Sequence, residues 1–277
     1  MSESFVATRL GRLHVKRTGT GPPVVLWHSL FIDSQSWGPL VDLLAGDRTV
    51  FTVDGPSHGR SGAVHRDFTF DECGAAAAEV LDGSNLAEPV DWVGNAWGGH
   101  VGIQLAAHRP GRIRTLATIG TPVHGLNARE RWVMCWPLVQ LYRMAGPSKV
   151  LMKALSKALI GPQALEAQPD QSAAIMAAFA SADRDGMFHA MRSMMLRRPG
   201  MESDVARVTA PTLLMAANDD AMGWQPSDAE KVAATMPDAR VTGVAGTGHV
   251  SPLLLDVEGI LTALRGFWDD VPIPYRP

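Results

Sequence analysis

The chain is poor in the features that mark several classes of protein. Its 277 residues include two cysteines, Cys73 and Cys135, which cannot build a disulfide framework and fit a reducing compartment. The net charge is −3 and no long run of like charges occurs, so nucleic acid is not an expected partner. No apolar stretch reaches the roughly 18 residues of a membrane span, and no basic segment leads into an apolar run at the N-terminus. These absences predict a cytoplasmic protein without a signal peptide or a membrane partner.

The composition is that of a chain that buries a core. Hydrophobic residues make up 46% and charged residues 19% of the sequence, and 27 glycines and 19 prolines divide it into short segments. The length allows one large domain, or one domain that carries an insertion.

Short apolar runs alternate with helical patterns along most of the chain. The runs that predict buried strands are 23–27, 49–53, 89–93, 115–119, 211–215 and 240–244, after a hairpin within 5–16 that turns at Gly11. Helices are expected at 70–82, 97–109, 226–236 and 254–268, and one more is expected to begin near Gln35. Strands that alternate with helices indicate crossover connections, and therefore an α/β fold with a mostly parallel, twisted sheet and helices on both faces.

One segment, 123–205, interrupts this alternation. It contains no good strand candidate, only helical patterns, and it holds nine of the 13 methionines. We interpret it as a helical cap inserted into an α/β core formed by 1–122 and 206–277. Methionine is adaptable and polarisable, which suits the lining of a site for a bulky apolar ligand.

The segment Gly94-Asn95-Ala96-Trp97-Gly98-Gly99 lies between a predicted strand and a predicted helix. Glycines two residues to either side of a central position form the nucleophile-elbow pattern G-x-S-x-G. The pattern needs glycines because the strand and the helix approach closely around a strained central residue. Here the central residue is Ala96, which has no nucleophilic atom.

Candidate partners for the elbow follow later strands. Asp219 and Asp220 end the fifth apolar run, and Gly248-His249 follows the sixth. A histidine can act as a general base, and a carboxylate can fix its tautomer. The chain order of elbow, carboxylate and histidine is the order of α/β hydrolases.

On these motifs, together with His28-Ser29-Leu30, Trp37 and the segment 54–61, the chain resembles the α/β-hydrolase superfamily over essentially its full length. The resemblance implies Ala96 at the nucleophile position, where an active member has serine, with Asp220 as the acid and His249 as the base. The resemblance favours Asp220 over Asp219 as the acid, because the family places this carboxylate three residues after the position of Ala217. It also implies an oxyanion hole made by the backbone N–H groups of Leu30 and Trp97.

The chain departs from the family pattern at a few positions. Ser29 and Ala217 stand where the family usually has glycine, and Trp224 stands where it usually has proline. The departure at Ala96 is the serious one, because it removes the group that would attack a substrate.

The predicted activity is hydrolysis of a hydrophobic, aromatic ester or lactone by acyl transfer, inactivated here at Ala96. One alternative is a carbon–carbon bond hydrolase of ring-cleavage products, with Arg129, Arg131 or Arg192 binding a carboxylated substrate. The alternative from another class is a non-catalytic ligand-binding protein. A haloalkane dehalogenase is less favoured, because its elbow usually has a different pattern.

The expected partner is a small hydrophobic substrate, and the sequence leaves a homodimer open. No metal motif of the H-E-x-x-H or Cys-x-x-Cys type occurs, and no cofactor is predicted. The predicted substrate-binding residues are His28, Ser29, Trp132, Trp136, Phe188, Met191, Met222 and Trp224.

Overall fold

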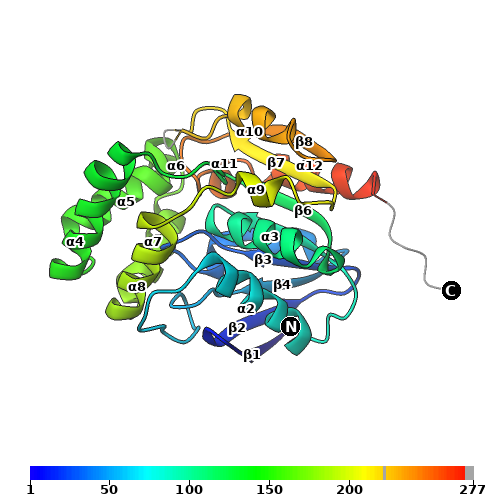
Figure 1. Ribbon diagram of the computed structural model, residues 1–277, viewed down its shortest axis with the longest axis horizontal. Helices are drawn as coiled ribbons and strands as arrows, with labels where there is room; N and C mark the ends of the chain where they lie inside the picture. Colours follow the sequence, from blue (N-terminus) through cyan, green and yellow to red (C-terminus); the bar gives the residue numbers. More distant parts are fainter. Residues whose placement is uncertain (221–222, 272–277) are drawn as a thin grey trace.

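The computed structural model of the protein describes residues 1–220 and 223–271, which contain one eight-stranded sheet (Figure 1). The order of the strands in the sheet is β1-β2-β4-β3-β5-β6-β7-β8. Their bounds are β1 (Ser2–Thr8), β2 (Gly11–Thr18), β3 (Pro23–Trp27), β4 (Thr49–Val53), β5 (Val90–Asn95), β6 (Ile113–Ile119), β7 (Thr212–Ala217) and β8 (Ala239–Val244).

The sheet is parallel from β4 to β8, while β1 and β2 pair antiparallel at one end. Every residue of β4, β5 and β7 is buried, which is why these strands read as continuous apolar runs without alternation. The parallel order places the carboxyl ends of β3, β5, β6 and β7 at one edge of the sheet, where ligands bind in open α/β sheets.

Helices cover both faces of the sheet. Trp92 of β5 and Leu116 of β6 pack on Gly102, whereas their neighbours Asp91 and Thr115 bond to each other and Thr115 bonds to Trp268. Because successive residues of a strand point to opposite faces, the helices of Gly102 and Trp268 lie on opposite sides. The helices of this core are η1 (Ser34–Trp37), α1 (Pro39–Leu44), α2 (Phe70–Gly83), α3 (Trp97–His108), η2 (Pro110–Arg112), α10 (Pro226–Ala233), α11 (Pro252–Leu255) and α12 (Val257–Asp269).

The connection from β6 to β7 is helical and extends to one side of the sheet (Figure 1). Its elements are η3 (Glu130–Cys135), α4 (Trp136–Ala145), α5 (Lys149–Leu159), α6 (Gly161–Ala167), α7 (Pro169–Ser181), α8 (Arg184–Ala190), η4 (Met191–Leu196) and α9 (Glu202–Val205). The N–H of Met201 donates to the carbonyl of Val123 at 2.8 Å, so the chain leaves and rejoins the core at one place. We keep 123–205 as the proposed cap, with the remainder as the core.

The structure refines several predicted elements. The segment expected as one helix over 254–268 is two, because the chain leaves helical geometry at Asp256, whose carboxylate accepts from the N–H of Ala245 at 2.8 Å. The helix expected near Gln35 is the 3-10 turn η1 followed by α1. Within 1–220 and 223–271, no helix is long and apolar enough to cross a bilayer.

Candidate functional site

The centre of the site is the turn from β5 into α3 at Ala96. Ala96 has φ 46° and ψ −103°, in the positive-φ region that costs a non-glycine residue roughly 1–3 kcal/mol. Its N–H donates to the carbonyl of Ile119 at 2.8 Å, which keeps the turn attached to β6. The Ala96 side chain is buried, with 6% of its surface exposed, at the N-terminal end of α3.

Two glycines permit this turn. A Cβ at Gly94 would lie 2.2 Å from the backbone of Gly98, and a Cβ at Gly98 would lie 1.9 Å from the carbonyl oxygen of Trp27. Both contacts involve backbone, which cannot rotate away as a side chain can. The elbow therefore depends on close approach between β3, β5 and α3.

A histidine and a carboxylate meet beside the elbow. Nδ1 of His249 lies 3.0 Å from Oδ2 of Asp220, and the Asp220 side chain is fully buried. Gly120, at the end of β6, lies against His249: a Cβ built there would be 3.4 Å from His249 Nδ1. Asp219, the competing carboxylate, is exposed. The structure thus brings Asp220 rather than Asp219 to the histidine.

Asn95, the residue before Ala96, holds the histidine segment in place. Its Nδ2 donates to the carbonyl of His249 at 2.7 Å and to that of Ile119 at 3.0 Å. The side chain is buried and its Oδ1 has no partner among the described residues. In the elbow motif Asn95 occupies an unspecified position, and nothing in the sequence indicates a contact across 154 positions.

The loop that carries His249 is also tied to itself and to the cap. The Ser251 hydroxyl accepts from the N–H groups of Thr247 and Gly248, at 2.9 Å each. The N–H of Val250 donates to the carbonyl of Leu159, the last residue of α5, at 2.9 Å. The position of the histidine thus depends on the core and on α5 together.

The loop after β3 carries His28, Ser29 and Leu30. Nε2 of His28 accepts from the N–H of Gly55 at 2.8 Å, and its Nδ1 lies 2.6 Å from the carbonyl of Ser29. Both ring nitrogens therefore bond to backbone, and the ring is fully buried. This geometry makes His28 a brace of the loop and leaves neither ring nitrogen available for a ligand, although the sequence predicts His28 as a substrate-binding residue. The N–H groups of Leu30 and Trp97 donate no hydrogen bond within the described residues.

A second histidine continues the brace. Nε2 of His58 accepts from the N–H of Phe31 at 3.2 Å, and the rings of His28 and His58 lie 5.1 Å apart with Trp97 against both. Burial lowers the pKa of His58 to about 3 and also lowers the pKa of His28. Both rings are therefore neutral at pH 7, and each can accept a backbone hydrogen bond.

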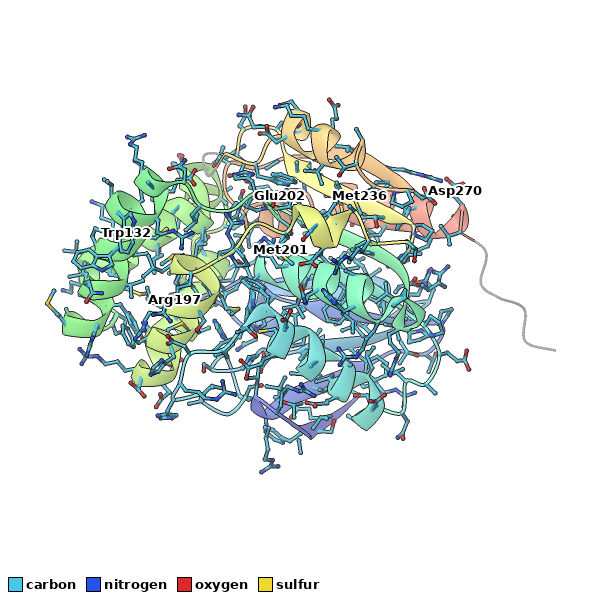
Figure 2. The ribbon with its side chains drawn as sticks, in the orientation of Figure 1. Trp132, Arg197, Met201, Glu202, Met236 and Asp270 are labelled. Atoms are coloured by element: carbon cyan, nitrogen blue, oxygen red, sulfur yellow. The ribbon has the colours of Figure 1, made fainter. Side chains whose placement is uncertain are left out.

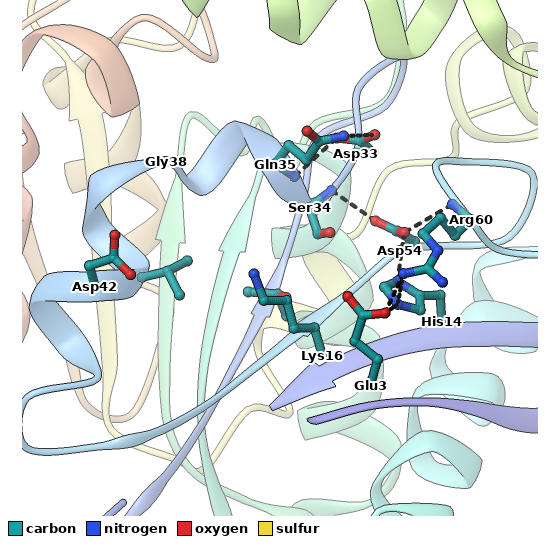
Figure 3. Close-up of a pocket in the computed structure, with 12 residues that line it drawn as sticks. Glu3, His14, Lys16, Asp33, Ser34, Gln35, Gly38, Asp42, Asp54 and Arg60 are labelled. Carbon is teal, nitrogen blue, oxygen red and sulfur yellow. Dashed lines mark hydrogen bonds and ion pairs between the residues drawn. The ribbon is translucent and has the colours of Figure 1, made fainter. Parts of the chain in front are cut away.

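Asp54 connects the segment that follows β3 with the segment that follows β4, through Ser34 and Arg60 (Figure 3). Its carboxylate accepts from the N–H of Ser34 at 2.9 Å and from that of Arg60 at 3.0 Å, and it lies 3.0 Å from Nδ1 of His14. Burial raises the pKa of Asp54, but the hydrogen bonds that its carboxylate accepts from these N–H groups outweigh burial, so the pKa lies below its ordinary value. Asp54 lines a polar cavity of about 430 Å³ that none of the predicted site residues borders.

The sequence of the chain is similar to known protein families over most of its length. The profile of the Alpha/beta hydrolase family matches residues 24–260, which include the elbow, Asp220 and His249. The chain belongs to this alpha/beta hydrolase family. A curated relative, the pimeloyl-[acyl-carrier protein] methyl ester esterase of Xanthomonas campestris pv. campestris (strain B100), is 28% identical over 270 residues, which cover 94% of this chain and 100% of the relative.

Solved structures of hydrolases share the fold. The enol-lactonase from Burkholderia xenovorans LB400 superposes with a TM-score of 0.86 at 22% identity, covering 96% of this chain and 100% of that one. A thermophilic esterase from Thermogutta terrifontis has a TM-score of 0.87 at 21% identity, with 98% and 99% covered. At these identities the likeness shows a shared fold, a mostly parallel sheet with helices, and nothing finer.

The structure does not bring all the predicted substrate-binding residues of this hydrolase together at one site. Trp132, Trp136 and Phe188 line one groove of about 440 Å³ in the cap, and this groove shares no lining residue with the elbow, Asp220 or His249. Met191 is fully buried in η4, and Trp224 is buried with its ring 6.3 Å from that of His124. Met222 lies outside the described residues.

The described part of the chain contains no group of three or more histidine, cysteine or acidic side chains that could hold a metal ion. Both cysteines are free, and burial raises the pKa of each thiol.

Proposed function

We propose that this alpha/beta hydrolase is built for acyl transfer on a hydrophobic, aromatic ester or lactone, with Ala96 at the position where an active form has serine. The observation that carries the proposal is the hydrogen bond between His249 and the buried Asp220, beside the strained turn at Ala96. The methyl ester esterase among the relatives and the lactonase and esterase among the structural neighbours support an ester or lactone as substrate.

Each group then has a chemical role. With serine at 96, His249 would accept the hydroxyl proton as the oxygen attacks the carbonyl carbon, and Asp220 would hold the histidine tautomer and stabilise the imidazolium. The N–H groups of Leu30 and Trp97 would bind the oxyanion, and Trp97 begins α3, whose N-terminus favours negative charge. The leaving group would take the proton from His249, and water would then release the acyl group by the same route.

A second candidate function is a binding protein on a hydrolase fold. The observation that favours it is the methyl side chain of Ala96, which cannot attack a carbonyl.

A structure of the chain with a hydrophobic ester tests the proposal. Removing the serine oxygen leaves most apolar contacts in place, so the ester should bind without turnover. We expect its carbonyl oxygen at about 2.7–3.1 Å from the N–H groups of Leu30 and Trp97, the distance that an oxyanion hole needs. An ester that binds with its carbonyl away from both N–H groups would count decisively against acyl transfer.

A further inference from the structure

The cap groove, lined by Trp132, Trp136 and Phe188 together with Arg131, Arg143, Arg192 and Arg197, has a composition that the reaction at the elbow does not explain. Its volume of about 440 Å³ is that of a small-molecule site. We propose that the cap groove binds an amphipathic carboxylate, an anion with an aromatic or alkyl body. This inference does not depend on the chemistry at Ala96.

The charges of the groove are unbalanced. Four guanidinium groups line it, and Asp67 is the acidic partner that two of them share, at 2.9 Å from Arg192 and 2.6 Å from Arg197. Asp67 also pairs with a histidine of α8. Across residues 1–220 and 223–271, neither Arg131 nor Arg143 makes an ion pair. A bound anion would therefore relieve the repulsion among these cations.

The walls of the groove suit the apolar part of such a ligand. The side chains of Trp132 and Trp136 are 59% and 44% exposed, unusual fractions for the largest apolar side chain. The guanidinium carbons of Arg143 and Arg192 lie 5.2 and 5.5 Å from the ring centre of Phe188. These cation–π contacts hold two of the charges against an apolar ring, where each guanidinium can still donate to a carboxylate.

Two π-helical turns build the groove. The elements η3 and η4 contact each other, and each is closed by an i→i+5 bond: Trp136 N–H to the carbonyl of Arg131, and Arg197 N–H to that of Arg192. In an α-helix, residues five apart do not share a face, whereas a π turn brings them together. All four of these residues line the groove, so the two π turns set its shape. Such turns are rare and occur frequently at functional sites.

Other occupants fit the observations less well. A two-fold dimer formed through this groove would bring Arg131 and Arg143 of two molecules together, which like-charge repulsion opposes. A membrane presents a flat surface, whereas the groove is a hollow between helices; Trp132 and Arg197 mark its position on the cap in Figure 2.

The test is titration calorimetry of the full chain with 2-naphthoate, compared with the neutral 2-naphthalenemethanol. We expect naphthoate to bind at least about tenfold more tightly than the alcohol. Arg143→Gln should weaken naphthoate binding by about tenfold, because a hydrogen bond between charged partners contributes about that factor to affinity. The matched control is Arg207→Gln, which removes an exposed arginine of the core and should leave the affinity unchanged. Equal affinity for both probes, or equal effects of the two variants, overturns the proposal.

Two further experiments locate the bound naphthoate and test for a membrane or a second copy of the chain as the occupant. His249→Gln should leave naphthoate affinity within about twofold; a loss as large as that of Arg143→Gln would place the carboxylate at the elbow and overturn the proposal. Retention on phosphatidylglycerol vesicles, or self-association in sedimentation velocity, without naphthoate binding would also overturn it. Circular dichroism of each variant confirms that the fold is kept.

Discussion

The elbow and the cap groove are built by opposite means. At the elbow, backbone atoms in close approach fix Ala96, and buried neutral histidines brace the adjoining loop. In the cap groove, long charged side chains and exposed tryptophans form the lining, and π turns set its width. A position for bond making is thus fixed by close backbone contacts, whereas a recognition surface is lined by long side chains on a backbone frame.

The largest effect is expected from Ala96→Ser, which adds a hydroxyl group at the elbow. We expect activity on p-nitrophenyl esters to rise by about 10⁶-fold, because loss of a triad nucleophile costs roughly that much in a serine protease. Adding His249→Gln should abolish the gain. If the folded serine variant turns over no ester, lactone or vinylogous diketone, the chain is better described as a binding protein.

Next in size is the contrast between the two neighbouring carboxylates. In the Ala96→Ser background, Asp220→Asn should lower kcat by about 10⁴-fold, because an amide can stabilise the wrong tautomer of His249. Asp219→Asn is the matched control; its side chain is exposed and it should change kcat by less than about twofold. Equal losses would remove the support for Asp220, and a larger loss at Asp219 would reverse the assignment.

A change at the elbow backbone should cost stability. Gly98→Ala places a methyl group against the carbonyl oxygen of Trp27, so β3 or α3 must move, and we expect a loss of at least about 3 kcal/mol of unfolding free energy. Gly111→Ala is the control, because a Cβ there meets no atom within 4 Å. Urea unfolding compares the two. A loss below about 1 kcal/mol at Gly98 would show that the elbow tolerates movement.

The buried histidines should make stability depend on pH. Burial lowers the pKa of His58 and of His100 to about 3, while the unfolded value is near 6.5, so their neutral forms stabilise the fold fully above about pH 6.5. Stability is then lost as the pH falls toward 3, by about 2 kcal/mol per histidine at pH 5. His100→Gln should flatten the curve measured by urea unfolding between pH 7 and pH 5. An unchanged slope would mean that His100 does not titrate between the two states.

The smallest effect is expected in the cap groove. Trp132 is 59% exposed, so Trp132→Ala should change the unfolding free energy by less than about 0.5 kcal/mol. A loss above about 2 kcal/mol would show that this wall is packed, and the contrast between the two regions would then disappear.

Much of the fold could be predicted because the strands are short apolar runs between glycines and prolines. The expected runs 23–27 and 49–53 coincide with β3 and β4, and the other parallel strands differ by one or two residues at their ends. The break at Asp256 could not be predicted, since it depends on a bond from its carboxylate to Ala245 on a different segment.

The candidate site divides in the same way. The glycine spacing singles out Ala96, and the order of the strands singles out His249 and the pair Asp219-Asp220, but the choice of Asp220 rests on the resemblance to α/β hydrolases. The structure places Asp220 3.0 Å from His249. The role of Asn95 and the exposure of Trp132 could not be predicted, because each is decided by neighbours far away in the sequence. A helical pattern shows that a residue is apolar but does not identify the surface that it meets.

The bond between Asn95 and His249 closes a loop of 154 positions, and this has a consequence for assembly. The β1–β2 hairpin closes a short loop at a small cost in chain entropy, whereas the contact at the elbow requires core segments before and after the cap to meet. The elbow with its histidine therefore exists only once the whole chain is folded. A ligand held there binds the folded state alone, and by mass action it raises the melting temperature of the entire core.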